Sequence, residues 1–353
     1  MKPNDTTEQQ HSQYLKRCFQ LARLGETYAF PNPIVGCVIV HNNEIIAEGF
    51  HKQYGEAHAE AHAIKSALEP YNLRALEPRL KESTIYVSLE PCSHTGKTPP
   101  CADLIIKHKF KRIVFSSSDP NPLVNSSDKI RAAGIEVIEP AELEPELVKQ
   151  SDYLNRIFFK NIKEPGSAWV VVKIATTTDG EMITEANEPR WITNSESRKD
   201  VHRMRSCHDL LITSIRTVEA DDPEYNVRHS AEELGLAEIK DPDIAILKSS
   251  TNLKNRNYKI FQSSKRKIIE AKVTDLKSTV KEFINLGYKR IMIEAGPKLS
   301  EAFIESGLVD EIVHYQASAI ETKYPGFLLI NSEIINSANE PVNTKRYFIN
   351  TGS

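Results

Sequence analysis

The sequence lacks a long apolar run and a strong excess of either charge. Its 45 basic residues against 48 acidic residues give a formal net charge of -3 at pH 7, so nothing attracts it generally to nucleic acid or anionic membranes. No stretch approaches the roughly 18 apolar residues of a membrane span, and residues 1–13 are polar, unlike a signal peptide. We therefore expect a cytoplasmic protein that acts on a small molecule, with no nucleic-acid and no membrane partner.

Cysteine and glycine are both sparse. The chain has five cysteines, an odd number without a secretion signal, which argues against a disulfide framework and for reduced thiols. Cys18, Cys37 and Cys207 lie among apolar or helical residues, where free cysteine packs as a small hydrophobic side chain. The 14 glycines are scattered, and none forms the G-x-G-x-x-G fingerprint of a Rossmann dinucleotide site.

At 353 residues, the chain is too long for one ordinary hydrophobic core, so we expect two domains. Residues 161–167 are the best linker candidate, because Pro165 and Gly166 interrupt both helices and strands there. The predicted domains are residues 1–160 and 168–353. Apolar strand patterns alternate with helical patterns in both, which favours layered α/β folds.

The expected elements of the first domain are a helix at 14–24, a hairpin of strands at 34–40 and 45–47, and a helix at 57–68. A strand at 84–89, a helix at 101–108, strands at 112–115 and 135–138 and a closing helix at 141–159 complete it. In the second domain we expect strands at 169–174, 209–213, 243–247, 290–294 and 311–315, with helices near 195–205, 274–286 and 298–306.

Residues 58–101 contain a pattern typical of a catalytic metal site. His58-Ala59-Glu60 is followed by Cys92 and, after eight intervening residues, Cys101. One imidazole and two thiolates leave the fourth tetrahedral position of zinc to water, as in catalytic rather than structural sites. Glu60 can then move a proton from that water to a leaving nitrogen. The pattern therefore predicts one zinc ion per chain and hydrolytic deamination.

Two other zinc arrangements compete with this interpretation. His62 or His94 could close the site as a fourth ligand, which would make the zinc structural. His58 and His62 are also four residues apart, as in zinc peptidases of the H-E-x-x-H type. Those enzymes need a glutamate directly after the first histidine, where this chain has Ala59, so peptidase chemistry is disfavoured.

The H-x-E motif and the following P-C resemble the zinc-dependent nucleobase deaminases, although eight residues rather than two separate the cysteines. With the segments Pro-Asn-Pro-Ile-Val-Gly at 31–36 and Asp-Pro-Asn-Pro at 119–122, the chain resembles the bifunctional deaminase/reductase family of riboflavin biosynthesis over nearly its whole length. The resemblance implies an N-terminal cytidine-deaminase-like α/β/α layered domain and a C-terminal α/β domain similar to dihydrofolate reductase.

For the first domain the resemblance implies zinc ligation by His58, Cys92 and Cys101 and catalysis by Glu60. Two of the implied substrate contacts have simpler alternatives, since Asn32 could shape a turn between its two prolines and Lys97 could be a solvated loop residue. In the family interpretation Lys97 meets a phosphate. The implied substrate contacts are Asn32, His51, Lys97, Asp119 and Asn121.

For the second domain the segments 173–180, 191–193 and 217–223 resemble the reductase half of the same family. The turn at 296–297 begins a predicted helix and suits a phosphate, while arginines suit a substrate phosphate. Trp191 could instead pack in a core, and Thr178, Ser214 and Ala295 depart from the family pattern. The implied NADPH contacts are Ala175, Trp191, Thr217, Asp221, Gly296 and Pro297; the implied substrate contacts are Pro189, Arg205, Tyr225, Arg228 and Glu294.

The resemblance implies zinc-dependent deamination of 2,5-diamino-6-(5-phosphoribosylamino)pyrimidin-4(3H)-one, followed by NADPH-dependent reduction of the ribosyl side chain to ribityl, in a homo-oligomer. No convincing proton donor stands out in the second domain, where Asp179, Asp221 and Glu294 are candidates. Two alternatives stay open from the residues alone. One is a deaminase of nucleic-acid bases, and the other is a non-catalytic protein with structural zinc and a nucleotide-binding or oligomerisation domain.

Overall fold

The computed structural model describes residues 3–70, 73–94, 99–122, 124–176, 195–248, 252–316, 327–337 and 340–349. The chain forms two compact units. Unit 1 comprises Met1–Pro165 with Gly235–Glu238, and unit 2 comprises Gly166–Leu234 with Ile239–Ser353. Helix α7 (Arg156–Lys163) makes the first residues of the predicted linker helical.

Unit 1 is built on a five-stranded mixed sheet with the order β2-β1-β3-β4-β5. The strand β1 runs antiparallel to both of its neighbours, whereas β3, β4 and β5 are parallel to one another. The loops that follow β3 and β4 therefore leave the same edge of the sheet. The strands are β1 (Gly36–His41), β2 (Glu44–Phe50), β3 (Thr84–Val87), β4 (Arg112–Phe115) and β5 (Glu136–Ile138).

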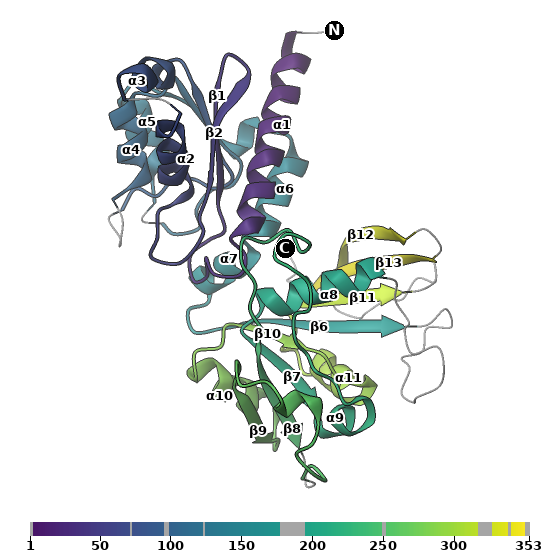
Figure 1. Cartoon of the computed structure of the whole chain (residues 1–353). Coiled ribbons are helices and arrows are strands. Elements are labelled where there is room, and N and C mark those ends of the chain that lie inside the picture. Colours follow the sequence, from purple (N-terminus) through teal and green to yellow (C-terminus); the bar gives the residue numbers. More distant parts are fainter. Residues whose placement is uncertain are drawn as a thin grey trace. The chain divides into compact units, whose positions relative to one another are not determined.

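Helices cover both faces of this sheet (Figure 1). Successive side chains of a strand point to opposite faces, so Cys37 and Ile39 join one apolar cluster while Val38 and Val40 join another. The first cluster includes residues of α2 (Ala59–Leu68), α3 (Leu73–Lys81), α4 (Cys101–His108) and α5 (Ser126–Ala132), and the second includes residues of α1 (Pro3–Leu24) and α6 (Pro145–Leu154). The predicted α/β/α layering is confirmed.

Two glycines allow backbone contacts that any side chain would block. A Cβ at Gly36 would lie 1.9 Å from the carbonyl oxygen of Cys18, and one at Gly25 would lie 2.1 Å from that of His51. The first contact brings α1 directly onto β1. The second fixes the backbone of His51, one of the predicted site residues.

Unit 2 is built on an eight-stranded sheet with the order β12-β13-β11-β6-β10-β7-β8-β9. The strands from β11 to β9 in this order are parallel, and β13 and β12 add an antiparallel edge. The strands are β6 (Trp169–Thr176), β7 (Leu210–Ser214), β8 (Asp243–Lys248), β9 (Ile268–Lys272), β10 (Arg290–Ile293), β11 (Glu311–Gln316), β12 (Phe327–Ser337) and β13 (Glu340–Ile349).

Apolar clusters on the two faces of this sheet draw on different helices. Phe283 of α10 (Leu276–Asn285) and Phe303 of α11 (Pro297–Glu305) pack in the larger cluster. Val218 of α9 (Ile215–Asp221) packs in another, with Ile244 and Ile246. Helix α8 (Ser195–Cys207) precedes β7. The α/β class predicted for this half is confirmed.

The closing helix predicted at 141–159 is wrong in one respect, because the segment is divided. A short 3-10 turn (Pro140–Glu142), α6 and α7 take its place. Asn155 lies between α6 and α7, is 2% exposed, and binds both backbone groups of Ile34: its Oδ1 accepts from the amide at 2.9 Å and its Nδ2 donates to the carbonyl at 3.1 Å. This tertiary contact ends α6, and no helical periodicity could have indicated it.

Several elements were not predicted. Helix α3 contains Pro78, a residue that normally ends a helix. The residues of α9, β9, β12 and β13 show no clear helical or strand periodicity.

In the part of the chain that the structure describes, every helix is too short or too polar to cross a bilayer.

Candidate active site

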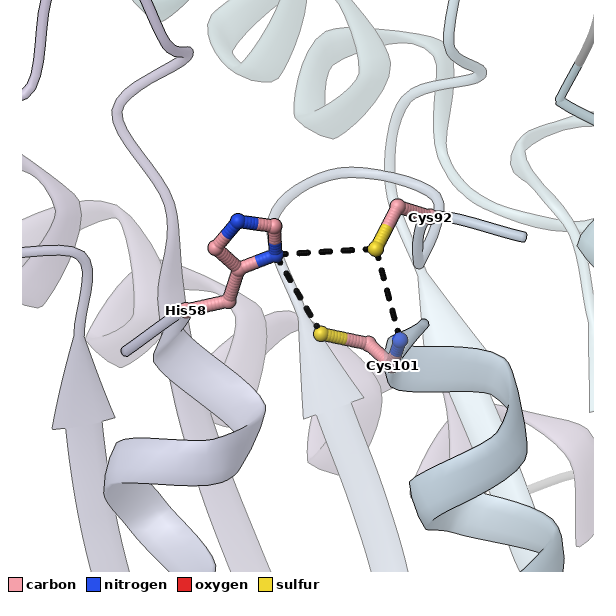
Figure 2. A group of neighbouring side chains, drawn as sticks. All are labelled: His58, Cys92 and Cys101. Carbon is pink, nitrogen blue, oxygen red and sulfur yellow. Dashed lines mark hydrogen bonds between the residues drawn. The ribbon is translucent and has the colours of Figure 1, made fainter. Parts of the chain in front are cut away.

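His58, Cys92 and Cys101 converge at one edge of the unit 1 sheet (Figure 2). His58 is the N-cap of α2, Cys101 is the first residue of α4, and Cys92 lies in the loop after β3. The Nδ1 atom of His58 is 3.5 Å from the Sγ of Cys92 and 3.4 Å from the Sγ of Cys101. Tetrahedral zinc with bonds of about 2.3 Å to sulfur and 2.0 Å to nitrogen requires ligand separations of about 3.5 Å. The three side chains thus fit a zinc ion.

The two cysteine thiols are joined by a hydrogen bond. It lowers the pKa of the Cys92 thiol, and the same bond together with burial raises the pKa of Cys101. The backbone amide of Cys101, at the start of α4, also donates to the Cys92 sulfur at 3.3 Å. Zinc binds cysteine as the thiolate, and the amide and helix dipole favour that form.

The competing zinc arrangements are not supported. The Nδ1–H of His62 donates to the carbonyl of Phe50 at 2.9 Å, and its ring packs on the Phe50 ring. His94 is exposed. Among the residues described here, only His58, Cys92 and Cys101 form a metal-ligand group, so a fourth position is left for a non-protein ligand.

Glu60 lies in the first turn of α2, two residues after His58, and is 3% exposed. Burial raises the pKa of its carboxyl group, and the negative charge of Cys92 adds to that rise. Cys101 forms a hydrogen bond with it. A carboxyl group with a raised pKa can both accept and return a proton near neutral pH.

A cavity of about 500 Å³ opens onto this group. His51 and Asn32 lie on its wall, with the Asn32 amide nitrogen 3.1 Å from His51 Nε2 and His51 Nδ1 3.1 Å from the carbonyl of Ala57. Burial lowers the pKa of His51, which favours a neutral ring that donates from Nδ1 and accepts at Nε2. The Asn32 side-chain oxygen is then the atom that can accept from a ligand N–H.

Asp119 and Asn121 line the same cavity from the loop after β4. The Oδ1 of Asp119 accepts the Asn121 amide at 2.8 Å, which holds the two side chains in a tight turn. Burial raises the pKa of Asp119, although the hydrogen bond from Asn121 opposes that rise. The structure therefore brings four of the five predicted substrate contacts together; the fifth, Lys97, lies outside the described residues.

The apolar wall of the cavity includes Phe158 and Ile162 of α7. No role was predicted for these residues from the sequence. Their i, i+4 spacing on one helical face was a signal that they face an apolar surface, but nothing in the pattern says which surface.

The predicted reductase site centres on Glu294, which directly follows β10 and is 8% exposed. Its carboxylate accepts two hydrogen bonds from Arg205, from Nε at 2.9 Å and from Nη2 at 2.8 Å, and lies 3.2 Å from the Nζ of Lys173 on β6. Burial would raise the pKa of Glu294, but the charges of Arg205 and Lys173 hold that pKa at about 2. Glu294 is therefore a fixed carboxylate between two cations.

Lys173 is the functional candidate that sequence reasoning missed in this half. It lies in the recognised segment 173–180, but its partner Glu294 is 121 residues away. Only the pairing of Val172 with Ile293 on adjacent parallel strands brings the two next to each other.

Arg205 and Tyr225 hold Glu294 in place. The third nitrogen of the Arg205 guanidinium donates to the carbonyl of Asn226 at 3.2 Å, and Tyr225 donates from its hydroxyl to the backbone carbonyl of Glu294 at 3.0 Å. The guanidinium also lies over the Tyr225 ring, 5.4 Å from its centre. Arg228, by contrast, has a side chain that is 55% exposed.

The predicted cofactor contacts that the structure describes lie near the end of β6, in α9 and at the start of α11. The Thr217 hydroxyl forms a hydrogen bond of 2.9 Å with the Ser214 hydroxyl and accepts a hydrogen bond of 3.2 Å from the backbone amide of Gly296. Because the Gly296 amide already donates to Thr217 and Pro297 has no N–H, an anion at this turn would be bound by the backbone amides of the residues after Pro297. Ala175 lies on β6 and Asp221 is exposed at the end of α9, while Pro189, Trp191 and the acid candidate Asp179 lie outside the described residues.

The fold and site of unit 1 define a zinc-dependent deaminase. Residues 8–117 match the family described as the cytidine and deoxycytidylate deaminase zinc-binding region, and residues 168–321 match the RibD C-terminal domain. The riboflavin biosynthesis protein RibD of Actinobacillus pleuropneumoniae is 32% identical, over 94% of this chain and 90% of the relative, and that of Escherichia coli K12 is 34% identical, over 87% and 88%.

Solved structures agree. RibD of Acinetobacter baumannii is 29% identical, with a TM-score of 0.71 over 97% of this chain and 99% of that one. The Thermotoga maritima diaminohydroxyphosphoribosylaminopyrimidine deaminase/5-amino-6-(5-phosphoribosylamino)uracil reductase is 27% identical, with a TM-score of 0.77 and the same coverage. The chain belongs to the RibD family of riboflavin biosynthesis proteins and is a bifunctional enzyme with a deaminase and a reductase domain. The predicted family, fold and bifunctional activity are confirmed.

Removing a ligand should abolish zinc binding. Loss of residues that merely support a ligand weakens metal binding about 10- to 100-fold, so Cys101→Ala and His58→Ala should each weaken zinc binding by at least about 100-fold. Zinc content of the purified protein, measured by atomic absorption, checks this. His62→Ala is the matched control on the same helix and should retain one zinc per chain; loss of zinc in that variant would restore the closed-site alternative.

Proposed function

We propose that unit 1 hydrolyses the exocyclic amine of 2,5-diamino-6-(5-phosphoribosylamino)pyrimidin-4(3H)-one and that unit 2 then reduces the ribosyl side chain with NADPH. The observation that supports the first step is the cavity of about 500 Å³ that combines the His58, Cys92 and Cys101 group with buried Glu60. This volume lies within the range of small-molecule sites, about 300 to 1,000 Å³. The name of the Thermotoga relative supports the substrate.

His58, Cys92 and Cys101 would hold the zinc ion. When bound, zinc lowers the pKa of a coordinated water to about 7 and so supplies a nucleophile at neutral pH. Glu60 takes the proton from the attacking water and delivers it to the exocyclic amino nitrogen, which then leaves as ammonia; its burial and raised pKa suit this role. Asn32 accepts from a ring N–H with its side-chain oxygen, and His51 holds Asn32 in that orientation.

The substrate phosphate needs a cation that the described wall of the cavity does not supply. The described lining residues include Glu60, Glu90 and Asp119 but neither lysine nor arginine. We assign the phosphate to Lys97, which belongs to the segment between the two cysteine ligands. The ring therefore lies at the zinc group, and the phosphate points toward that segment.

NADPH supplies the hydride in unit 2, and the protein orients it. Thr217 and the Gly296–Pro297 turn, joined by a hydrogen bond, support a cofactor site that also includes Ala175, Trp191 and Asp221. On the substrate side we assign the phosphate to Arg228, whose exposed guanidinium is available to an anion. Pro189 and Tyr225 complete the proposed substrate contacts, and Arg205 acts by positioning Glu294.

Lys173 is the proposed proton donor for opening the ribose ring. Its ammonium group is 3.2 Å from a carboxylate that two other hydrogen bonds hold in place. Glu294 orients this ammonium group. Cytoplasmic location and homo-oligomer formation stay predictions from the sequence and from the family resemblance.

A coupled assay on the full chain tests the proposed sequence of reactions. Ammonia release and NADPH oxidation are followed together after addition of the diaminopyrimidinone ribosyl phosphate. We expect ammonia first and NADPH oxidation after it. Zinc removal should stop both signals, whereas the deaminated intermediate added to the zinc-free protein should still oxidise NADPH. Ammonia release without any NADPH oxidation would refute the proposed second step.

Glu60→Gln separates catalysis from metal binding. The amide keeps the size of the side chain but cannot accept the proton, and loss of general acid–base catalysis costs about 10² to 10⁴ in rate. We expect kcat for deamination to fall by that factor while zinc content and the reduction of added intermediate stay normal. Glu142→Gln, in the 3-10 turn of the same unit, is the control; wild-type deamination by Glu60→Gln would remove Glu60 from this role.

Lys173→Met tests the proton donor of the second step. The substitution keeps the length of the side chain and removes its proton, so kcat for reduction should fall by about 10² or more while deamination in the same chain is unaffected. Lys281→Met, on the exposed face of α10, is the matched control. Stopped-flow measurement of NADPH oxidation with added intermediate gives the rate, and an unchanged kcat would assign the proton transfer to another group.

A further inference from the structure

Glu90 lies between β3 and the metal ligand Cys92, and neither the zinc group nor the proton transfer uses it. Its Oε1 accepts two hydrogen bonds from Ser126, from the amide at 3.0 Å and from the hydroxyl at 2.9 Å. Its Oε2 accepts the backbone amide of Asp119 at 3.3 Å. All three bonds run from one carboxylate to the loop that follows β4.

These bonds hold the two ends of a functional loop. Asp119 is near the start of the loop, and Ser126, which is fully buried, is the first residue of α5. Asn125, the N-cap of α5, provides no side-chain cap, so the Glu90 carboxylate caps this helix from another segment. Between its anchored ends the loop carries Asp119 and Asn121 into the deaminase cavity.

A fourth hydrogen bond joins the same two segments. The amide of Asn125 donates to the hydroxyl of Ser93 at 3.2 Å. The segment 90–93, which contains Cys92, is thus tied to the loop on both sides of the metal ligand. A shift of this loop would move the substrate contacts relative to the zinc group, which is the distance that a deaminase must hold constant.

We propose that Glu90 is a positioning residue for deamination: it fixes Asp119 and Asn121 at a set distance from the metal-ligand segment, and it acts through Ser126 and the Asp119 backbone. This inference rests on the proposed deamination. Since the loop holds the ring equally before and during reaction, its loosening weakens substrate binding more than the chemical step.

Glu90→Gln is the principal test. A carboxamide has one acceptor oxygen, so it cannot accept from both Ser126 and the Asp119 amide, and one donor is left facing an NH₂ group. Hydrogen bonds to charged groups contribute enough for a roughly 10-fold or larger effect on binding when they are lost. We expect KM for deamination to rise by about that factor, with kcat within about threefold of wild type, unchanged zinc content and unchanged reduction of added intermediate.

Ser126→Ala completes a double-mutant cycle. It removes one of the bonds to Oε1 and should raise KM less than Glu90→Gln does. If Glu90 acts through Ser126, the double variant should show a smaller rise than the product of the two single effects. Asp128→Asn, which removes an exposed carboxylate from the same first turn of α5, is the matched control for charge and should keep the wild-type KM.

Three results would overturn the inference. An unchanged KM in Glu90→Gln would show that the loop holds its place without this residue. Fully multiplicative effects in the double variant would mean that Glu90 does not act through the Ser126 hydroxyl. Loss of zinc in Glu90→Gln would mean that it supports Cys92 instead. Wild-type protein that releases no ammonia would refute the proposed deamination itself, and this outcome is distinct from all three.

Discussion

Burial of negative charge beside one imidazole is the constraint on which the deaminase unit depends. Cys92, Cys101 and Glu60 can together carry three negative charges, and all three lie at the same edge of the sheet. This state is disfavoured without a compensating cation, because the hydrogen bond to Cys92 and burial raise the pKa of Cys101 and burial raises that of Glu60. A divalent cation removes the conflict for the thiolates and leaves Glu60 the one group there that can exchange a proton.

The α/β architecture places these groups where they are needed in both units. Parallel strands deliver their carboxyl ends to one edge of a sheet, and the loops beyond that edge form ligand sites. In unit 1, Glu90 and Cys92 follow β3 and Asp119 follows β4, its parallel neighbour. In unit 2, Lys173 lies in the middle of β6, beside the carboxyl end of the parallel strand β10, which Glu294 directly follows. Each site therefore depends on the register of two adjacent strands.

This dependence explains what the sequence could and could not predict. The ligands His58, Cys92 and Cys101 were predictable because residue type and short spacing identify a metal site. Most helices and the strands other than β9, β12 and β13 were predictable from periodicity. The contact of Lys173 with Glu294 was not predictable, and neither were the hydrogen bonds that Glu90 accepts from the loop after β4. Each requires the pairing of strands distant in sequence. Asn155 divides a predicted helix for the same reason, through its bonds to Ile34.

The degree of burial separates the charges that position other groups from those that can bind a ligand. Arg205 has only 11% of its side chain exposed and gives all of its nitrogens to Glu294 and Asn226. To bind a phosphate it would have to give up its two bonds to the buried Glu294 carboxylate, which would then keep only the Lys173 ion pair, and breaking a buried pair costs far more than an exposed ion pair returns. Arg228, 55% exposed and 4.0 Å from its nearest carboxylate, has no such cost. Two arginines that look equivalent in the sequence therefore differ in their availability to a ligand, because the guanidinium of Arg205 is engaged within the fold and that of Arg228 is exposed.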